Sequence, residues 1–186
     1  MNRLNIILPL IKNKEVLDFG SVGTLQNITP TKKKKHLFLE MKNLAKSLTG
    51  VDIHESKHVD LGIIQGNAET INLKKQFDVV VMGEIIEHSD NQGLMINNAY
   101  KHLKKGGLLI ISTPNARSWK LFVSQPFKHH TLIHTKETLQ QLVERQGFQT
   151  KKIHVVMGNK EYNLLLRSVF SLLGDFNSTL VGVFEK

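Results

Sequence analysis

Cysteine is absent from the 186-residue sequence. Its absence excludes disulfide bonds, thiolate nucleophiles and thiolate metal sites, so any reactive group must be an oxygen or a nitrogen. The sequence also lacks an apolar run near the roughly 18 residues that span a bilayer. Residues 1–15 have too short an apolar part, and too much charge after it, for a secretory signal peptide. We therefore expect a cytoplasmic protein without a transmembrane segment.

Acidic residues are in deficit, with 16 Asp and Glu against 25 Lys and Arg, which gives a formal net charge of +9. Such a surplus favours contact with an anion, such as nucleic acid, a phosphorylated metabolite or a lipid surface. Lysines scattered for solubility account for the surplus equally well. With 40% hydrophobic residues, the chain can bury one sizeable core. We expect a single domain over residues 1–186.

The most informative stretch is EVLDFGSVG, residues 15–23. Val16, Leu17 and Phe19 are typical of a buried strand that ends around Asp18 and turns sharply at two glycines. In an open parallel sheet, such a turn lies at the carboxyl edge of the strands, where ligands bind. The stretch therefore indicates a ligand site, although a tight turn can require glycine for its own sake.

Strand and helix patterns alternate along the rest of the chain, which favours a doubly wound α/β sheet. Residues 1–13 contain Pro9, so we expect a packed arm there and no regular element. The last third begins with a helix capped by Thr135. The other expected elements are helices at 37–48 (ended by Gly50), 54–61, 91–104 (ended by Gly106 and Gly107) and 161–173, and strands at 51–53, 62–65, 76–83, 108–112, 152–157 and 179–184.

Four motifs in order resemble the class I S-adenosylmethionine-dependent methyltransferases, in particular the small type 11 and type 23 branch. They are VLDFGSVG, TGVDI, FDVVVMGEIIEH and LKKGGLLIISTPN. The resemblance covers roughly residues 15–149 and departs from the family pattern at Val22, where a further glycine is common. It implies a mostly parallel, seven-stranded Rossmann-like sheet with helices on both faces, and S-adenosylmethionine as the cofactor.

The resemblance also implies which residues hold the cofactor. Asp52, at the end of the second strand, is expected to accept hydrogen bonds from the ribose hydroxyls. Asp18 would face the ammonium and sulfonium groups, or only cap the turn. The remaining expected contacts are backbone groups of Gly20, Ser21, Val22 and Gly23 at the methionine carboxylate, Ile53, Asn67 and Ala68 at the adenine, and Gly83 and Glu84 beside the cofactor.

Methyl transfer is an in-line displacement, and a hydroxyl acceptor benefits from a base with a pKa near neutrality. Histidine supplies such a base, and the candidates are His88, His130 and His134. His88 has the alternative role of holding the next loop by a hydrogen bond. No metal is expected, because the sequence has no H-E-x-x-H pattern.

The resulting hypothesis is a methyltransferase for a small or lipid-linked metabolite. The alternatives are an RNA or protein methyltransferase, favoured by the basic charge, and a catalytically silent nucleotide-binding module on the same fold. The regular apolar face predicted for residues 161–173 would cover an apolar acceptor, contact a membrane surface, or pack into the core.

Overall fold

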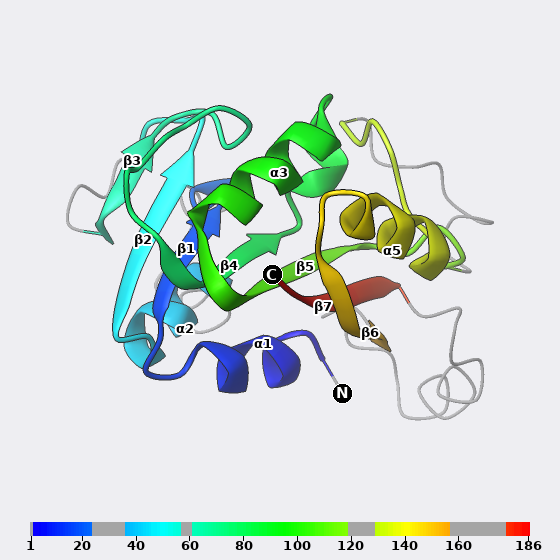
Figure 1. Ribbon diagram of the computed structural model, residues 1–186, viewed down its shortest axis with the longest axis horizontal. Coiled ribbons are helices and arrows are strands. Elements are labelled where there is room, and N and C mark those ends of the chain that lie inside the picture. Colours follow the sequence, from blue (N-terminus) through cyan, green and yellow to red (C-terminus); the bar gives the residue numbers. More distant parts are fainter. Residues whose placement is uncertain (1, 24–35, 57–60, 119–128, 157–177) are drawn as a thin grey trace.

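Seven strands form one sheet in the order β3-β2-β1-β4-β5-β7-β6 (Figure 1). The computed structural model describes residues 2–23, 36–56, 61–118, 129–156 and 178–186. All neighbouring strands run parallel except β7, which is antiparallel to β5 and β6. The strands are β1 (Glu15–Phe19), β2 (Ser47–Asp52), β3 (Ile63–Gln65), β4 (Phe77–Gly83), β5 (Leu103–Pro114), β6 (Gln149–Val156) and β7 (Thr179–Glu185). The predicted mostly parallel, seven-stranded sheet is confirmed.

Helices cover both faces of this sheet (Figure 1). Helices α1 (Leu4–Ile11) and α2 (Leu37–Leu44) pack on one face, and α3 (Gln92–His102) and α5 (Lys136–Glu144) pack on the other. In β4, Val79 and Val81 join the core cluster under α1 and α2, whereas Val80 and Met82 join the cluster under α3 and α5. Because side chains alternate along a strand, a continuous apolar run such as that of β4 is buried on both faces.

Two predicted helices end earlier than their glycines suggested. Helix α2 ends at Leu44, and Gly50 lies inside β2, where an added Cβ would come within 2.6 Å of the Ser21 Oγ. Helix α3 ends at His102, and Gly106 lies within β5. In both places, residues that the apolar periodicity assigned to the helix pair with a neighbouring strand instead.

Residues 4–11 form a helix, α1, so the prediction of an arm without regular structure is wrong. Pro9 lies inside it and is exposed, while Ile6, Ile7 and Ile11 are buried under the sheet. A proline inside a helix removes one backbone hydrogen bond and crowds the preceding turn. Burial of three isoleucines, each worth about 1.5–3 kcal/mol, offsets that cost.

The cap predicted at α5 is confirmed. Thr135 accepts a hydrogen bond from the Thr138 N–H, and the Thr138 hydroxyl in turn accepts one from the Thr135 N–H. The predicted helix at 161–173 lies outside the described residues, as do residues 57–60 of the one at 54–61, whose described residues 54–56 are not helical. Among the helices that the structure describes, none is long and apolar enough to cross a membrane.

Replacing Ile7 tests whether α1 belongs to the core. Ile7 is fully buried, so Ile7→Ala should lower the free energy of unfolding by about 2–4 kcal/mol, through lost burial and the cavity left behind. Urea unfolding measures this change, with Asn5→Ala on the exposed side of the same helix as the control. Equal stability of the two variants would show that α1 contributes nothing to the core.

Candidate active site

The turn after β1 is built tightly around Gly20. Its φ angle of +81° lies in the left-handed region, where side chains are strained, and a Cβ would lie 2.8 Å from the Ile85 side chain. The Gly20 N–H donates to the carbonyl of Val51 on β2, 2.8 Å away. Packing thus requires this glycine before any ligand is considered. Gly23 also has a positive φ, of +31°.

Asp52 ties the glycine turn to the end of β2. Its Oδ2 accepts a hydrogen bond from the Val22 N–H at 2.8 Å, and its Oδ1 accepts one from the His54 N–H at 2.9 Å. The carboxylate is buried and held in one orientation, with a further acceptor position on each oxygen. The neighbouring Ile53 is 64% exposed, an uncommon setting for a large apolar side chain. The two residues predicted for ribose and adenine therefore present the required chemistry at one edge.

The turn residues between these anchors are themselves buried. Ser21 and Val22 are each 1% exposed, and the Ser21 hydroxyl donates to the carbonyl of Asp18 at 2.8 Å. The Val22 N–H is occupied by Asp52. These contacts make Val22, where the resemblance predicted a further glycine, part of the packing of the turn.

Asp18 is a buried carboxyl group without a full charge partner. Its pKa is raised to about 7, chiefly by burial and also by the nearby Asp52, although a Ser21 hydrogen bond and the charge of Arg3 lower it. An ionised carboxylate here is costly unless a cation lies beside it. The position predicted to face a sulfonium or ammonium group is thus one that a cation would stabilise.

Arg3 is a site residue that the sequence analysis missed. Its Nη1 lies 3.3 Å from Glu84 Oε1 at the end of β4, and its charge also acts on Asp18 and Glu87. The Arg3 Nε is buried and has no hydrogen-bond partner in the structure. Glu84 has a left-handed φ of +57°, and Gly83 before it packs so closely on Leu37 that a Cβ would lie 2.7 Å away.

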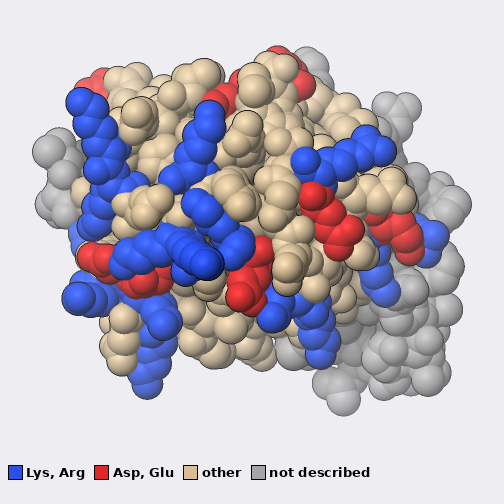
Figure 2. Space-filling view, in the orientation of Figure 1, with Lys and Arg blue, Asp and Glu red and all other residues tan. Residues whose placement is uncertain are grey.

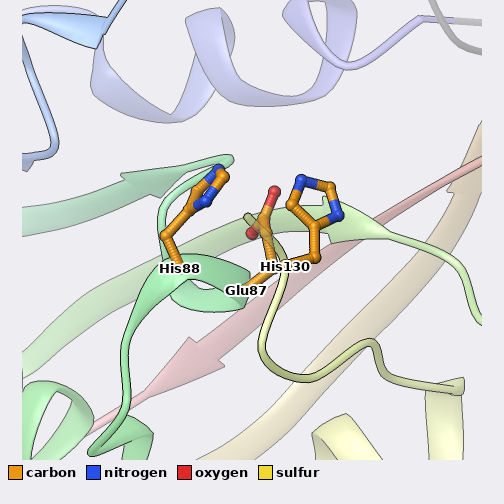
Figure 3. A group of neighbouring side chains, drawn as sticks. All are labelled: Glu87, His88 and His130. Carbon is orange, nitrogen blue, oxygen red and sulfur yellow. The ribbon is translucent and has the colours of Figure 1, made fainter. Parts of the chain in front are cut away.

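Glu87 and two histidines gather beyond the end of β4 (Figure 3). Glu87 lies in the short 3₁₀ helix η4 (Ile86–His88) and is buried, and Thr113 Oγ1 donates to its Oε2 at 3.1 Å. Burial, and secondly repulsion from Glu84, raises the pKa of Glu87 to about 8. The ring centroids of His88 and His130 lie 4.8 Å apart in an edge-to-face arrangement.

The hydrogen bonds of His88 define its basic atom. His88 Nδ1 lies 3.0 Å from the His129 carbonyl, which only accepts, so Nδ1 carries the proton and Nε2 is the basic nitrogen. His88 therefore holds the 129–134 loop, as its alternative role required. Burial and the neighbouring His88 lower the pKa of His130 below its usual value, which favours a neutral ring able to accept a proton.

His134, the third candidate base, lies apart from this pair. Gln92 Nε2 donates to the Ile86 carbonyl, so Gln92 Oε1 accepts from His134 Nε2 at 2.7 Å. The other ring nitrogen, Nδ1, lies 3.4 Å from Thr138 Oγ1, and the ring is 3% exposed. These partners fit a residue that fixes the loop between β5 and α5.

Side-chain hydrogen bonds also fix the turn at residues 67–70. Asn67 is exposed, and its Oδ1 accepts from the Glu69 N–H at 2.8 Å, which starts the turn. The carbonyl of the buried Ala68 accepts from Asn98 of α3 at 2.9 Å. The predicted adenine contact uses the same side-chain oxygen, Oδ1, of which only one further acceptor position is left, so the adenine contact stays a prediction.

A metal ion has one candidate place among the described residues. Glu87, His88 and His130 each offer a ligand atom, and these atoms lie within 4.8 Å of one another. Carboxylate and imidazole are ordinary ligands of divalent metals. The absence of a metal from the mechanism stays a prediction.

Comparison with known proteins decides the family. Residues 2–153 match the model of a family described as a methyltransferase domain. The chain belongs to this family. The match confirms the resemblance to the type 23 branch and, with it, S-adenosylmethionine as the predicted cofactor.

The relatives of this methyltransferase domain include a ubiquinone biosynthesis O-methyltransferase of Rickettsia conorii. It is 32% identical over 114 residues, which are 61% of this chain and 39% of the relative. The chain thus spans well under two thirds of that relative's length.

Solved structures share the fold. An S-adenosylmethionine-dependent methyltransferase from Mesorhizobium loti aligns with a TM-score of 0.67 at 14% identity, over 98% of this chain and 95% of its own. The N-methyltransferase NodS from Bradyrhizobium japonicum, solved with S-adenosyl-L-homocysteine, aligns with a TM-score of 0.64 at 13% identity, over 99% and 85%.

Replacing Asp52 tests the ribose contact. Asp52→Asn should weaken S-adenosylhomocysteine binding at least tenfold, because each charge-assisted hydrogen bond to a ribose hydroxyl is worth roughly 1.5–3 kcal/mol. Calorimetry on the folded variant measures the affinity, and Asp90→Asn, an exposed carboxylate after η4, is the control. Unchanged affinity in Asp52→Asn would remove this residue from the cofactor site.

The raised pKa of Asp18 predicts how cofactor affinity depends on pH. Below pH 7 the carboxyl group is largely neutral, and above it an anion that attracts the cationic cofactor. Affinity for S-adenosylmethionine should therefore rise several-fold from pH 6 to pH 8, and more weakly in Asp18→Asn. Calorimetry at pH 6, 7 and 8 compares the two proteins, so titration of the cofactor's own ammonium cancels. Identical pH profiles would show that Asp18 does not face the cation.

The raised pKa of Asp18 also predicts how the stability of the ligand-free protein depends on pH. Since the folded-state pKa lies above the ordinary value, the protonated form favours folding at low pH, and this contribution is lost as pH rises through about 7. Wild-type stability, measured by urea unfolding, should thus fall relative to Asp18→Asn between pH 5 and pH 8. A constant difference between the two proteins would contradict the raised pKa.

Proposed function

We propose that this domain transfers a methyl group from S-adenosylmethionine to a hydroxyl oxygen of a small molecule. The observation that carries the proposal is the pairing of His88 and His130 beside the buried Glu87, next to the edge that holds Asp18 and Asp52. A neutral imidazole at that place suits the deprotonation of a hydroxyl group. The O-methyltransferase named among the relatives supports an oxygen acceptor.

Side chains along the carboxyl edge of the sheet match the charge and hydrogen-bonding groups of each part of the cofactor. Asp52 and Ile53 would hold the ribose and adenine, and Asp18 would lie beside the positive charge. Arg3 offers a cation to the methionine carboxylate, while Glu84 offers an anion to the ammonium group. Before binding, Arg3 and Glu84 neutralise each other.

In this proposal His130 is the base. Its neutral ring would accept the proton of the acceptor hydroxyl as the hydroxyl oxygen bonds to the methyl carbon. The bound S-adenosylmethionine would supply that methyl group from its sulfonium and leave as a neutral thioether. His88 holds the segment that carries His130, and Glu87 offers a carboxyl oxygen within 4.8 Å of a His130 ring nitrogen, where the Glu87 anion would stabilise a protonated ring. Positioning of the two reactants provides the rest of the acceleration.

A lipid-linked acceptor is the finer version of this proposal. Its support in the sequence is the apolar pattern of residues 161–173, which lie outside the described part of the chain. Leu132, 54% exposed on the loop after His130, is a described apolar group near the acceptor side.

Removing the proposed base should separate chemistry from binding. His130→Asn should lower kcat for methylation of a phenolic probe such as catechol by about 10²–10⁴-fold, the range of general base catalysis, and leave S-adenosylhomocysteine affinity within twofold. Transfer of a radiolabelled methyl group measures kcat. Calorimetry with S-adenosylhomocysteine measures cofactor affinity, and the same titration with NAD, the cofactor of dehydrogenases on related folds, should show no binding. His134→Asn is the control for disturbance of the loop. A full rate in His130→Asn would exclude this residue as the base.

A further inference from the structure

The edge of the sheet opposite the candidate active site is rich in lysine. Because β1 to β6 run in one direction and β7 runs against them, the starts of these strands and the end of β7 meet at this edge. Every strand of the sheet except β3 has a lysine within two residues of its end at this edge. The amino-edge lysines, as we call them, are Lys14, Lys46, Lys74, Lys75, Lys101, Lys104, Lys105, Lys151 and Lys186.

Contacts place these lysines in one row along the sheet. The Lys46 N–H donates to the Lys14 carbonyl at 2.9 Å, joining the starts of β2 and β1. Lys104 Nζ lies 2.7 Å from Glu15 of β1 and 2.8 Å from Asp78 of β4. The row therefore follows β2, β1, β4 and β5 in spatial order.

The row continues through the last two strands. The Gly106 N–H donates to the Lys186 carbonyl at 3.1 Å, and Lys151 Nζ lies 2.8 Å from Glu185 of β7. Six neighbouring strands at about 4.8 Å spacing give a row on the order of 24 Å long. Figure 2 shows Lys and Arg side chains gathered over the region where Figure 1 places the start of β4 and the C-terminal end.

Local carboxylates neutralise only part of this charge. Glu15, Asp78 and Glu185 are the side-chain carboxylates paired with the row, against nine lysines. Hydrogen bonds from Lys104 hold the pKa of Glu15 and of Asp78 below their usual values, so both stay ionised. Several amino-edge lysines are exposed and have no ion pair with a described residue, namely Lys14, Lys46, Lys74, Lys101 and Lys105.

The composition of the row indicates the class of partner. It contains lysines and no arginine, which suits non-specific attraction to phosphates better than bidentate recognition of one group. The large apolar side chains that the structure describes as exposed, Ile53, Ile64, Leu94 and Leu132, lie outside the row. No described aromatic ring is exposed there for base stacking, as single strands require.

We propose that the amino-edge lysines bind the phosphate backbone of double-stranded nucleic acid, without regard to sequence. A narrow row of positive charge matches a linear polyanion along its whole length. A lipid surface is a plane, and a single row of lysines would contact only a narrow strip of its headgroups. At the opposite edge the described carboxyl groups are buried, as in Asp18, Asp52 and Glu87, or paired with Arg3, as in Glu84, so the attraction of a polyanion comes from the amino-edge lysines. The bound duplex would leave the methyl-transfer site open.

Charge reversal in the row tests the proposal. Binding of a fluorescent 20-base-pair RNA duplex is measured by anisotropy between 50 and 200 mM salt. Lys74→Glu/Lys105→Glu should weaken binding at least tenfold and make the log–log salt dependence shallower by about two. Arg117→Glu/Lys136→Glu removes the same charge near the start of α5, at the opposite edge, and should change affinity less than threefold.

Three outcomes would overturn the proposal. They are no duplex binding at 50 mM salt, equal weakening in both double variants, and binding of phosphatidylglycerol vesicles without binding of the duplex. S-adenosylhomocysteine affinity of Lys74→Glu/Lys105→Glu should equal that of the wild type. This readout separates the duplex surface from the proposed methyl transfer, because either proposal can fail while the other stands.

Discussion

Withdrawal of carboxyl groups from water is the constraint around which the candidate active site is arranged. Asp18, Asp52 and Glu87 are buried at the ends of adjacent strands. Asp52 is satisfied by two backbone N–H groups, whereas Asp18 and Glu87 keep raised pKa values because their hydrogen bonds do not offset burial. Without a ligand, such a site favours neutral acids, and a cationic ligand favours their anions. The chemistry of a sulfonium cofactor fits that imbalance.

The cations and histidines of the site relate to the same constraint. Arg3 comes from the N-terminal helix on one face of the sheet, and its charge lowers the electrostatic cost at both Asp18 and Glu87. His88, at the end of η4, and His130, before α5, offer ring nitrogens within 4.8 Å of the Glu87 carboxyl group, which lies between them in Figure 3. A buried carboxyl group that feels the charge of an arginine and lies near two imidazoles suits a step in which a proton moves.

Much of this architecture could be predicted from local sequence, and the failures have physical causes. Strands β1 and β4 are predictable because a continuous apolar run that ends at glycine is typical of a strand buried on both faces. The ends of α2 and α3 are not, because Gly50 and Gly106 look like helix stops and only strand pairing shows that they lie in β2 and β5. The contact of Arg3 with Glu84 joins residues 81 positions apart, and no local pattern encodes it. The approach of His130 to His88 likewise joins residues 42 positions apart, which no local pattern encodes.

Strand β7 has a consequence for the order of folding. It pairs with β5 on one side and β6 on the other, and Thr179 to Phe184 are buried. Strand β6, although it is made earlier on the ribosome, therefore has no partner until β7 is inserted. Its unpaired edge and the apolar flank of β5 remain open until residues 179–185 leave the exit tunnel. Closure of the sheet is thus a long-range event, and β7, which follows β6 in the chain, completes the hydrophobic core on both faces.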